Sequence, residues 1–164
     1  MKKKGLVLCL AEGFTLVELL LVIGIFAILA TLTSINYFST YSNSNLSAAK
    51  DVLIADIKSA QSSAMAGKGQ NGQPVDGWGI KVNDGSSYTL FPGIIYDPNN
   101  SENNITVLVT GVNISTNLPD SSLSFSHGSG ELSTYLPGQD ALTLTSGSIS
   151  RVIRLNQYGT IIGD

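Results

Sequence analysis

A single carboxylate interrupts a long apolar stretch near the N-terminus of this 164-residue chain. Residues 13–18 read Gly13-Phe14-Thr15-Leu16-Val17-Glu18, and the residues from Leu19 to Ser34 carry no charge. An ionisable side chain in a hydrocarbon environment costs about 2.5–3.5 kcal/mol on insertion scales, so such residues are commonly functional. The chemistry that this pattern indicates is ion pairing of the Glu18 carboxylate within an apolar helix.

This block, behind a leader that carries Lys2, Lys3 and Lys4, resembles the processing site of type IV prepilins and type II secretion pseudopilins. The resemblance implies a leader at residues 1–13, which a prepilin peptidase removes by cleavage between Gly13 and Phe14 on the cytoplasmic side. It also implies N-methylation of Phe14 and retention of the apolar helix. An ordinary secretory signal is a weaker alternative, because small residues are poorly placed for cleavage after the apolar run. An uncleaved signal anchor would explain the run but not Glu18.

Cleavage would give Phe14 a free amine, which is positive at neutral pH. Glu18 lies four residues later, one helical turn away, and could therefore pair with its own amine or with that of a neighbouring subunit. In the family this pairing is thought to set the axial register of a new subunit in the filament. The alternative is that the Glu18 side chain only reaches to the lipid headgroups.

The rest of the chain divides into a transmembrane helix at 14–35, a helix extension at 36–66 and a β-rich head at 67–164. In the extension, Ala49, Leu53, Ile57, Ala60 and Ala64 share one face of a 3.6-residue period. Gly67-Lys68-Gly69 is expected to end the helix. Major pilins usually have a kink-forming proline at the position that Ile35 occupies, so its absence favours a minor pilin or pseudopilin.

Short β-type runs alternate with turn residues through the head. Gly77–Val82 and Tyr88–Phe91 flank Asn83-Asp84-Gly85, which predicts a hairpin. Further strands are predicted at Ile105–Thr110, Ala141–Thr145, Ile149–Leu155 and Thr160–Ile162, the last two as a second hairpin. The fold class expected is α+β, with an antiparallel sheet packed on the C-terminal half of one long helix. In outline this order is similar to the H-type minor pseudopilins and the FimT-type minor pilins.

Residues of the head indicate neither catalysis nor a bound cofactor. His127 is the single histidine and is expected in a solvated loop, too isolated for a catalytic or zinc site. Oxygen ligands in Asp97–Asn103 leave calcium open, although the loop fails the EF-hand pattern. Arg151 and Arg154 are the only arginines and are a possible ligand contact, but their odd spacing in a strand predicts opposite faces.

The leading interpretation is a structural minor pilin or pseudopilin. Expected partners are the prepilin peptidase, sibling pilins, the assembly platform protein and the bacterial inner membrane, from which the C-terminal domain is exported into an extracellular or periplasmic filament. The alternative is a filament-tip binding module for DNA or an adhesive ligand. DNA is disfavoured because the whole chain carries −3 and the leader +2, so residues 14–164 carry −5. The sequence leaves pilus, secretion and competence machines undistinguished.

Overall fold

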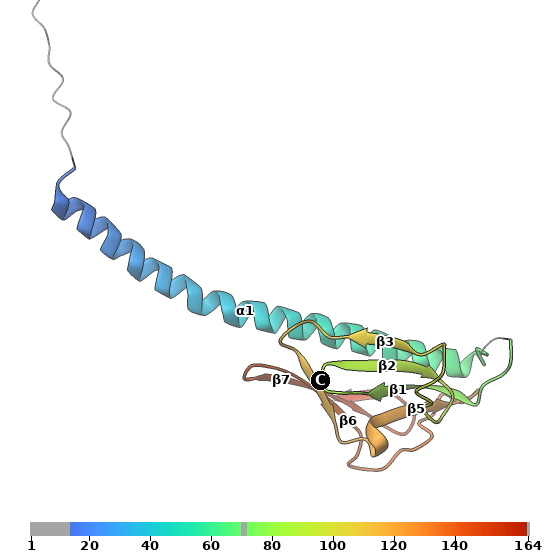
Figure 1. Ribbon diagram of the computed structural model, residues 1–164. Coiled ribbons are helices and arrows are strands. Elements are labelled where there is room, and N and C mark those ends of the chain that lie inside the picture. The colour runs from blue at the N-terminus through green and yellow to red at the C-terminus, as the bar shows by residue number, and fades with distance from the viewer. Residues whose placement is uncertain (1–13, 70–71, 164) are drawn as a thin grey trace, which may run out of the picture. The chain divides into compact units, whose positions relative to one another are not determined.

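The computed structural model describes residues 14–69 and 72–163, excepting the side chains of 32–39 (Figure 1). The predicted leader at residues 1–13, which includes Gly13 and the sole cysteine, Cys9, therefore lies outside the described residues. The chain divides into two compact units, Met1–Ser39 and Thr40–Asp164. Helix α1, Leu16–Met65, contributes residues to both units.

The apolar face predicted for the second half of α1 is confirmed. Ala49, Leu53, Ile57, Ala60 and Ala64 are all buried, and Leu46 extends the same face by one turn towards the N-terminus. These residues pack into one core with side chains from the strands. The helix is amphipathic from Leu46 onward, and its apolar face is the one that the strands cover.

The predicted end of the helix is also confirmed, and its geometry is a Schellman motif. The Gly67 N–H donates to the Ala64 carbonyl (3.1 Å) and the Lys68 N–H to the Ser63 carbonyl (2.9 Å). Gly67 has φ +62°, a left-handed conformation that glycine adopts without the steric cost of a Cβ. The Lys68 carbonyl then accepts the Trp78 indole N–H at 2.8 Å, which ties the end of the helix to the first strand.

The described residues contain eight strands in two four-stranded antiparallel sheets, which confirms the α+β fold class. The first sheet has the order β3-β2-β1-β5 and contains β1 (Gly77–Val82), β2 (Ser87–Pro92), β3 (Asn104–Val107) and β5 (Ser122–Ser126). The second has the order β4-β6-β7-β8 and contains β4 (Asn113–Thr116), β6 (Ala141–Ser146), β7 (Ile149–Leu155) and β8 (Ile161–Gly163). A short 3-10 turn, η1, covers Pro119–Ser121.

The strands lie along the C-terminal half of α1 (Figure 1). Ile80, Tyr88 and Phe125 of the first sheet and Leu142, Leu144 and Ile153 of the second are buried in the same cluster as the helix face. The expectation of a single sheet was therefore incomplete, because the helix is covered by strands from two sheets. Strands β4 and β5 had no counterpart among the sequence predictions.

The predicted hairpin around Asn83-Asp84-Gly85 is present as the β1–β2 pair. The Asp84 carboxylate accepts hydrogen bonds from the Ser86 N–H (3.0 Å), the Ser86 hydroxyl (2.9 Å) and the Ser87 hydroxyl (3.0 Å). These donors, the Ser86 backbone first among them, lower the pKa of Asp84. Gly85 has φ +84°, as a glycine-containing hairpin turn requires.

The predicted β7–β8 hairpin is present too, but its second strand begins one residue later than expected. Thr160 is used to close the turn: its N–H donates to the Asn156 side chain (2.9 Å) and its carbonyl accepts the Asn156 N–H (3.0 Å). Similarly, β3 ends at Val107 and not at Thr110. The chain turns after Leu108, with the Val112 N–H donating to the Val109 carbonyl (3.0 Å) and Gly111 at φ +89°.

One buried polar contact joins the helix to the first sheet. The Tyr88 hydroxyl, within the core, donates to the Asp56 carboxylate at 2.7 Å. Burial of the phenol, together with the hydrogen bond and the negative charge of Asp56, raises the pKa of Tyr88 well above its ordinary value of about 10. The contact satisfies the one polar atom that Tyr88 brings into the core.

Candidate functional site

The N-terminal end of α1 is a capping box built from Thr15 and Glu18. The Glu18 carboxylate accepts hydrogen bonds from the Thr15 N–H (3.0 Å) and the Thr15 hydroxyl (2.9 Å), and the Glu18 N–H donates back to the same hydroxyl (3.3 Å). The Thr15 carbonyl accepts the Leu19 N–H at 3.2 Å, which is the first helical hydrogen bond. This reciprocal arrangement satisfies backbone N–H groups that have no partner within the helix.

The spacing Thr-x-x-Glu before an apolar run is a sequence signature of such a box, and it was available in the sequence. Sequence reasoning assigned Glu18 an ion-pairing role and missed this local one. The two roles are compatible, because a carboxylate has two oxygens with about four lone-pair positions. The contacts with Thr15 use a single carboxylate oxygen of Glu18, Oε2, and its backbone N–H.

The apolar side chains from Phe14 to Leu29, in and around the capping box and along the helix after it, are exposed within the unit that contains them. Phe14 is 79% exposed, Leu16 73% and Phe26 68%. The other large apolar residues of this stretch are exposed as well: Val17, Leu19, Leu20, Leu21, Val22, Ile23, Ile25, Ile28 and Leu29. Consecutive positions of a helix point in all directions, so the apolar surface surrounds this part of α1 and is not confined to one face.

Within the described residues, no helix meets the combined length and apolarity expected of a membrane span. The transmembrane helix predicted at 14–35 is therefore not supported by the structure.

Of the two residues at the predicted cleavage position, Gly13 and Phe14, the structure describes only Phe14. Gly13 lies outside the described residues, whereas Phe14 and Thr15 precede the first helical residue and are exposed. Phe14 therefore precedes the N-cap residue and is not part of the first helical turn.

The two arginines lie on β7 and border one cavity of about 350 Å³. The Arg151 guanidinium donates to the Asn43 side-chain oxygen at 3.2 Å. Arg154 forms an ion pair with Asp140 at 3.3 Å, in which the Arg154 side chain is 54% exposed and Asp140 only 9%. The odd spacing of the two arginines predicted that they lie on opposite faces of the strand, and the shared cavity was not anticipated. Strand β7 also has a register irregularity between Arg154 and Leu155.

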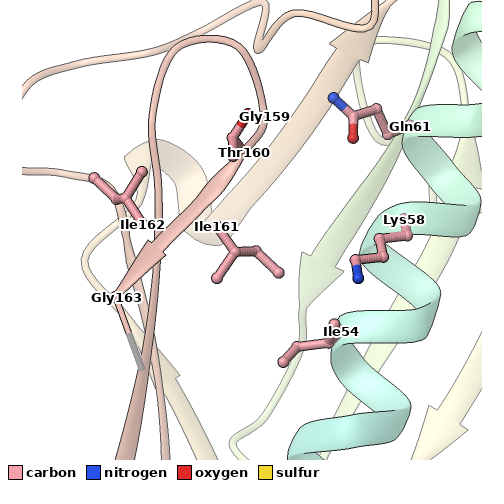
Figure 2. Close-up of a pocket in the computed structure, with 8 residues that line it drawn as sticks. All are labelled: Ile54, Lys58, Gln61, Gly159, Thr160, Ile161, Ile162 and Gly163. Atoms are coloured by element: carbon pink, nitrogen blue, oxygen red, sulfur yellow. The ribbon is translucent and has the colours of Figure 1, made fainter.

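A larger cavity, of about 600 Å³, lies between α1 and the C-terminal strand (Figure 2). It is lined by Ile54, Lys58 and Gln61 of the helix and by Gly159–Gly163. The Gln61 amide group already donates to the carbonyls of Gly130 and Tyr158, both at 2.9 Å. Lys58 is the one ionisable side chain of this lining, so the cavity lacks the paired acid and base that a catalytic site needs.

His127 is placed by the backbone of its loop. Its N–H donates to the Asp76 carbonyl at 2.9 Å, and the N–H of Gly128 donates to the helix carbonyl of Ala64 at 3.0 Å. A Cβ at Gly67 would come within 2.6 Å of the His127 ring, so the ring packs against the end of α1. Across the described part of the chain, no three His, Cys, Asp or Glu residues are grouped to hold a metal ion.

Several oxygens of the Asp97–Asn103 loop accept hydrogen bonds within the loop, whereas the buried side-chain oxygen of Asn103 has no hydrogen-bond partner among the described residues. The Asp97 carboxylate accepts the Asn99 N–H at 2.9 Å, and the Asn100 side chain accepts the Glu102 N–H at 2.9 Å. The Asp97 carbonyl accepts the side-chain amide of Asn103 at 2.8 Å. The contacts of the Asp97 carboxylate and the Asn100 side chain are Asx-type turns.

Comparison with known proteins gives one match, at the N-terminus. Residues 11–34 match the family model of the prokaryotic N-terminal methylation motif. No curated protein and no solved structure matches the chain. The match supports placing the chain among type IV pilin-like and pseudopilin proteins, which are structural subunits processed by prepilin peptidase.

Proposed function

We propose that this protein is a minor pilin or pseudopilin, a structural subunit of a type IV pilus or type II secretion filament. The prepilin peptidase cleaves it between Gly13 and Phe14, and Phe14 is then N-methylated. Its partners are the peptidase, sibling pilins and the assembly platform protein. The H-type minor pseudopilins and FimT-type minor pilins are the proposed relatives, because a helix followed by a Trp-Gly strand and a Tyr strand matches their outline.

The contrast between the two parts of α1 carries this proposal. From Leu46 onward the helix buries its apolar residues under its own head. The residues from Leu16 to Leu29 have no such cover in the unit to which they belong, and an apolar surface on all sides of a helix calls for an apolar environment supplied by other molecules. Helices of neighbouring subunits supply it in a filament, and we propose that inner-membrane lipid supplies it before assembly, with the head exported.

Glu18 has a specific role in this proposal. In the unprocessed chain Phe14 is in peptide linkage to Gly13, so its amine is not available, and the Glu18 carboxylate is bound to Thr15. Cleavage creates an ammonium group one turn away from that carboxylate. Pairing with the ammonium of a neighbouring subunit would compensate a charge that is costly in apolar surroundings, and it would fix the axial register of the new subunit.

Mass spectrometry of the protein from its native membrane fraction tests the processing step. We expect an N-terminus at Phe14 carrying one methyl group. The leader offers a matched pair of variants, since Gly13→Val alters the residue before the proposed scissile bond and Gly5→Val alters a glycine eight residues upstream. Gly13→Val should keep the leader and Gly5→Val should lose it. An intact Met1 terminus in a strain with active prepilin peptidase would refute the proposal.

A filament-tip module for DNA gains no support from the site. The cavity is bordered by two arginines, and Asp140 offsets the charge of Arg154. Non-specific DNA affinity grows with the number of phosphates neutralised, and a chain of net charge −3 offers few cations for them. The structural role is therefore the function we propose.

A further inference from the structure

Strand β7 is open along most of one side. It has seven residues, Ile149–Leu155, and β6 pairs with Ile149–Arg154 on one side of it. On the other side β8 is in register with Arg154 and Leu155 alone. Among the described strands none pairs with Ile149–Ile153 on that side. Alternate residues of an antiparallel strand direct their N–H and C=O groups to the same side, so this stretch presents unpaired backbone donors and acceptors.

A cavity lies beside the open stretch. It has a volume of about 350 Å³ and is lined by Ser150, Arg151, Val152, Arg154 and Gly163. Its lining therefore runs along β7 and ends at the last described residue of β8. A chain segment placed there would continue the line of β8 along the edge of the sheet.

Two guanidinium groups lie at this edge, and one of them is paired with Asp140. Arg151 and Arg154 are the only arginines of a chain with net charge −3, and both border the cavity. A guanidinium has five N–H donors. Arg151 uses one nitrogen in its hydrogen bond to the neutral Asn43, and Arg154 uses one nitrogen in its contact with Asp140. Each guanidinium thus retains N–H groups that could donate hydrogen bonds to a carboxylate.

We propose that this open edge of β7 binds an extended acidic segment of a partner protein, which adds to the sheet as a strand. Backbone hydrogen bonds to Ile149–Ile153 would hold the segment, and its carboxylates would meet Arg151 and Arg154. The stretch is about 17 Å long at about 3.3 Å per residue, so it accommodates about five residues of the partner. This inference does not depend on the proposed role in a filament.

A peptide suits this edge better than a nucleic acid does. A strand edge offers alternating N–H and C=O groups, which match another peptide backbone and not a phosphate chain. Two arginines would neutralise at most about two phosphates, which gives a weak and salt-sensitive interaction with DNA. The nucleic acid is therefore the competing outcome in the test.

The test uses the full chain, ¹⁵N-labelled in detergent micelles, and three synthetic eight-residue peptides. The first alternates valine with glutamate, the second replaces each glutamate with glutamine, and the third is the first with alternate backbone amides N-methylated so that one edge lacks donors. A 20-base-pair DNA duplex is the fourth probe. Amide shifts of Ser150, Arg151 and Val152 report binding at the edge.

We expect the acidic peptide to shift these three amides selectively and to bind the double variant Arg151→Gln/Arg154→Gln about three- to tenfold more weakly, since exposed ion pairs contribute modestly. The control variant Lys81→Gln removes a positive charge from the other sheet and should bind as the unaltered chain does. The glutamine and N-methylated peptides should both bind more weakly than the first peptide. An unchanged amide spectrum away from β7 in each variant shows that the fold is intact.

Three results would overturn the proposal. The first is equal binding of the N-methylated peptide, because it would exclude strand addition. The second is DNA binding that depends on the arginines while the acidic peptide leaves Ser150–Val152 unshifted. The third is no response of these amides to any peptide.

Discussion

Two roles of Glu18 can be separated by a pair of substitutions. The carboxylate caps the helix through Thr15, and we propose that after processing it also pairs with a Phe14 amine. Glutamine is accepted at this position of a capping box, so Glu18→Gln keeps the cap and removes the charge. Thr15→Val keeps the charge and removes the hydroxyl, at a cost of about 1 kcal/mol for a lost N-cap.

If the charge drives assembly, Glu18→Gln should lower recovery of the protein in sheared filaments by about tenfold or more, because the amine of the processed chain is left without a compensating charge. Thr15→Val should be recovered nearly as well as the unaltered chain. Quantitative immunoblots of filament and membrane fractions measure both. The reverse ranking would assign Glu18 to helix capping alone.

Tyr88 is the residue whose titration should affect the stability of the head. Its folded pKa is raised, so the folded state holds the phenol proton at pH values where the unfolded chain has lost it. The corresponding stability is fully present below about pH 10, the ordinary tyrosine pKa, and declines as the pH rises above it. Tyr88→Phe should remove this component, and it should cost about 1–2 kcal/mol at neutral pH through loss of the bond to Asp56.

Urea unfolding at pH 8 and at pH 10.5 measures this effect. Tyr158→Phe is the matched control because Tyr158 is 58% exposed. The difference in unfolding free energy between the two pH values should shrink in Tyr88→Phe and stay unchanged in Tyr158→Phe. Equal pH dependence in all three proteins would contradict the assignment.

At the scale of elements, the end of α1 depends on a glycine for two separate reasons. Gly67 has φ +62°, and a Cβ there would lie 2.6 Å from the His127 ring. Gly147 has a nearly equal φ of +58° but nothing within 4 Å of the corresponding Cβ position. Gly147→Ala should therefore cost about 1–2 kcal/mol from backbone strain alone. Gly67→Ala should cost about 1–3 kcal/mol more, from the added steric conflict.

Thermal unfolding of the two variants measures the difference. In a His127→Ala background the excess cost of Gly67→Ala should largely disappear, since the ring that it meets is gone. Persistence of the excess would show that the Gly67 effect comes from elsewhere in the helix cap.

At the scale of the whole molecule, the unit Thr40–Asp164 contains a complete core. The buried face of α1 from Leu46 to Ala64 and the buried residues of both sheets form one cluster. The sole cysteine, Cys9, lies in the predicted leader, and the described residues offer no metal-binding group of three or more ligands. We therefore expect a protein truncated to start at Thr40 to unfold in one cooperative transition.

Neither a reductant nor a chelator should shift the midpoint of that transition. Circular dichroism melts with and without each reagent, at matched ionic strength, measure this. A decrease of several degrees with chelator, restored by added calcium, would reject the metal-free account and assign an ion to the Asp97–Asn103 loop.

Local features of this protein could be read from its sequence because their causes lie within a few residues. The spacing of Ala49, Leu53 and Ile57 predicted the buried helix face, Gly67 predicted its end, and Asp84-Gly85 predicted the first hairpin. The Thr15–Glu18 capping box was equally local and was missed only because Glu18 was interpreted through its charge.

Other features were decided only by tertiary structure. The strands divide between two sheets, and β5 lies beside β1. Both arrangements bring together residues that are distant in sequence, and so does the contact between Asp56 and Tyr88. Strands β4 and β5 are short and their pairing partners are remote, so no local pattern identifies their neighbours. The common border of Arg151 and Arg154 also depends on where β8 stops covering β7. Sequence periodicity specifies which side of a helix or strand is buried. The packing of the whole head decides which helices and strands contact one another, because non-local contacts there compensate the loss of chain entropy on folding.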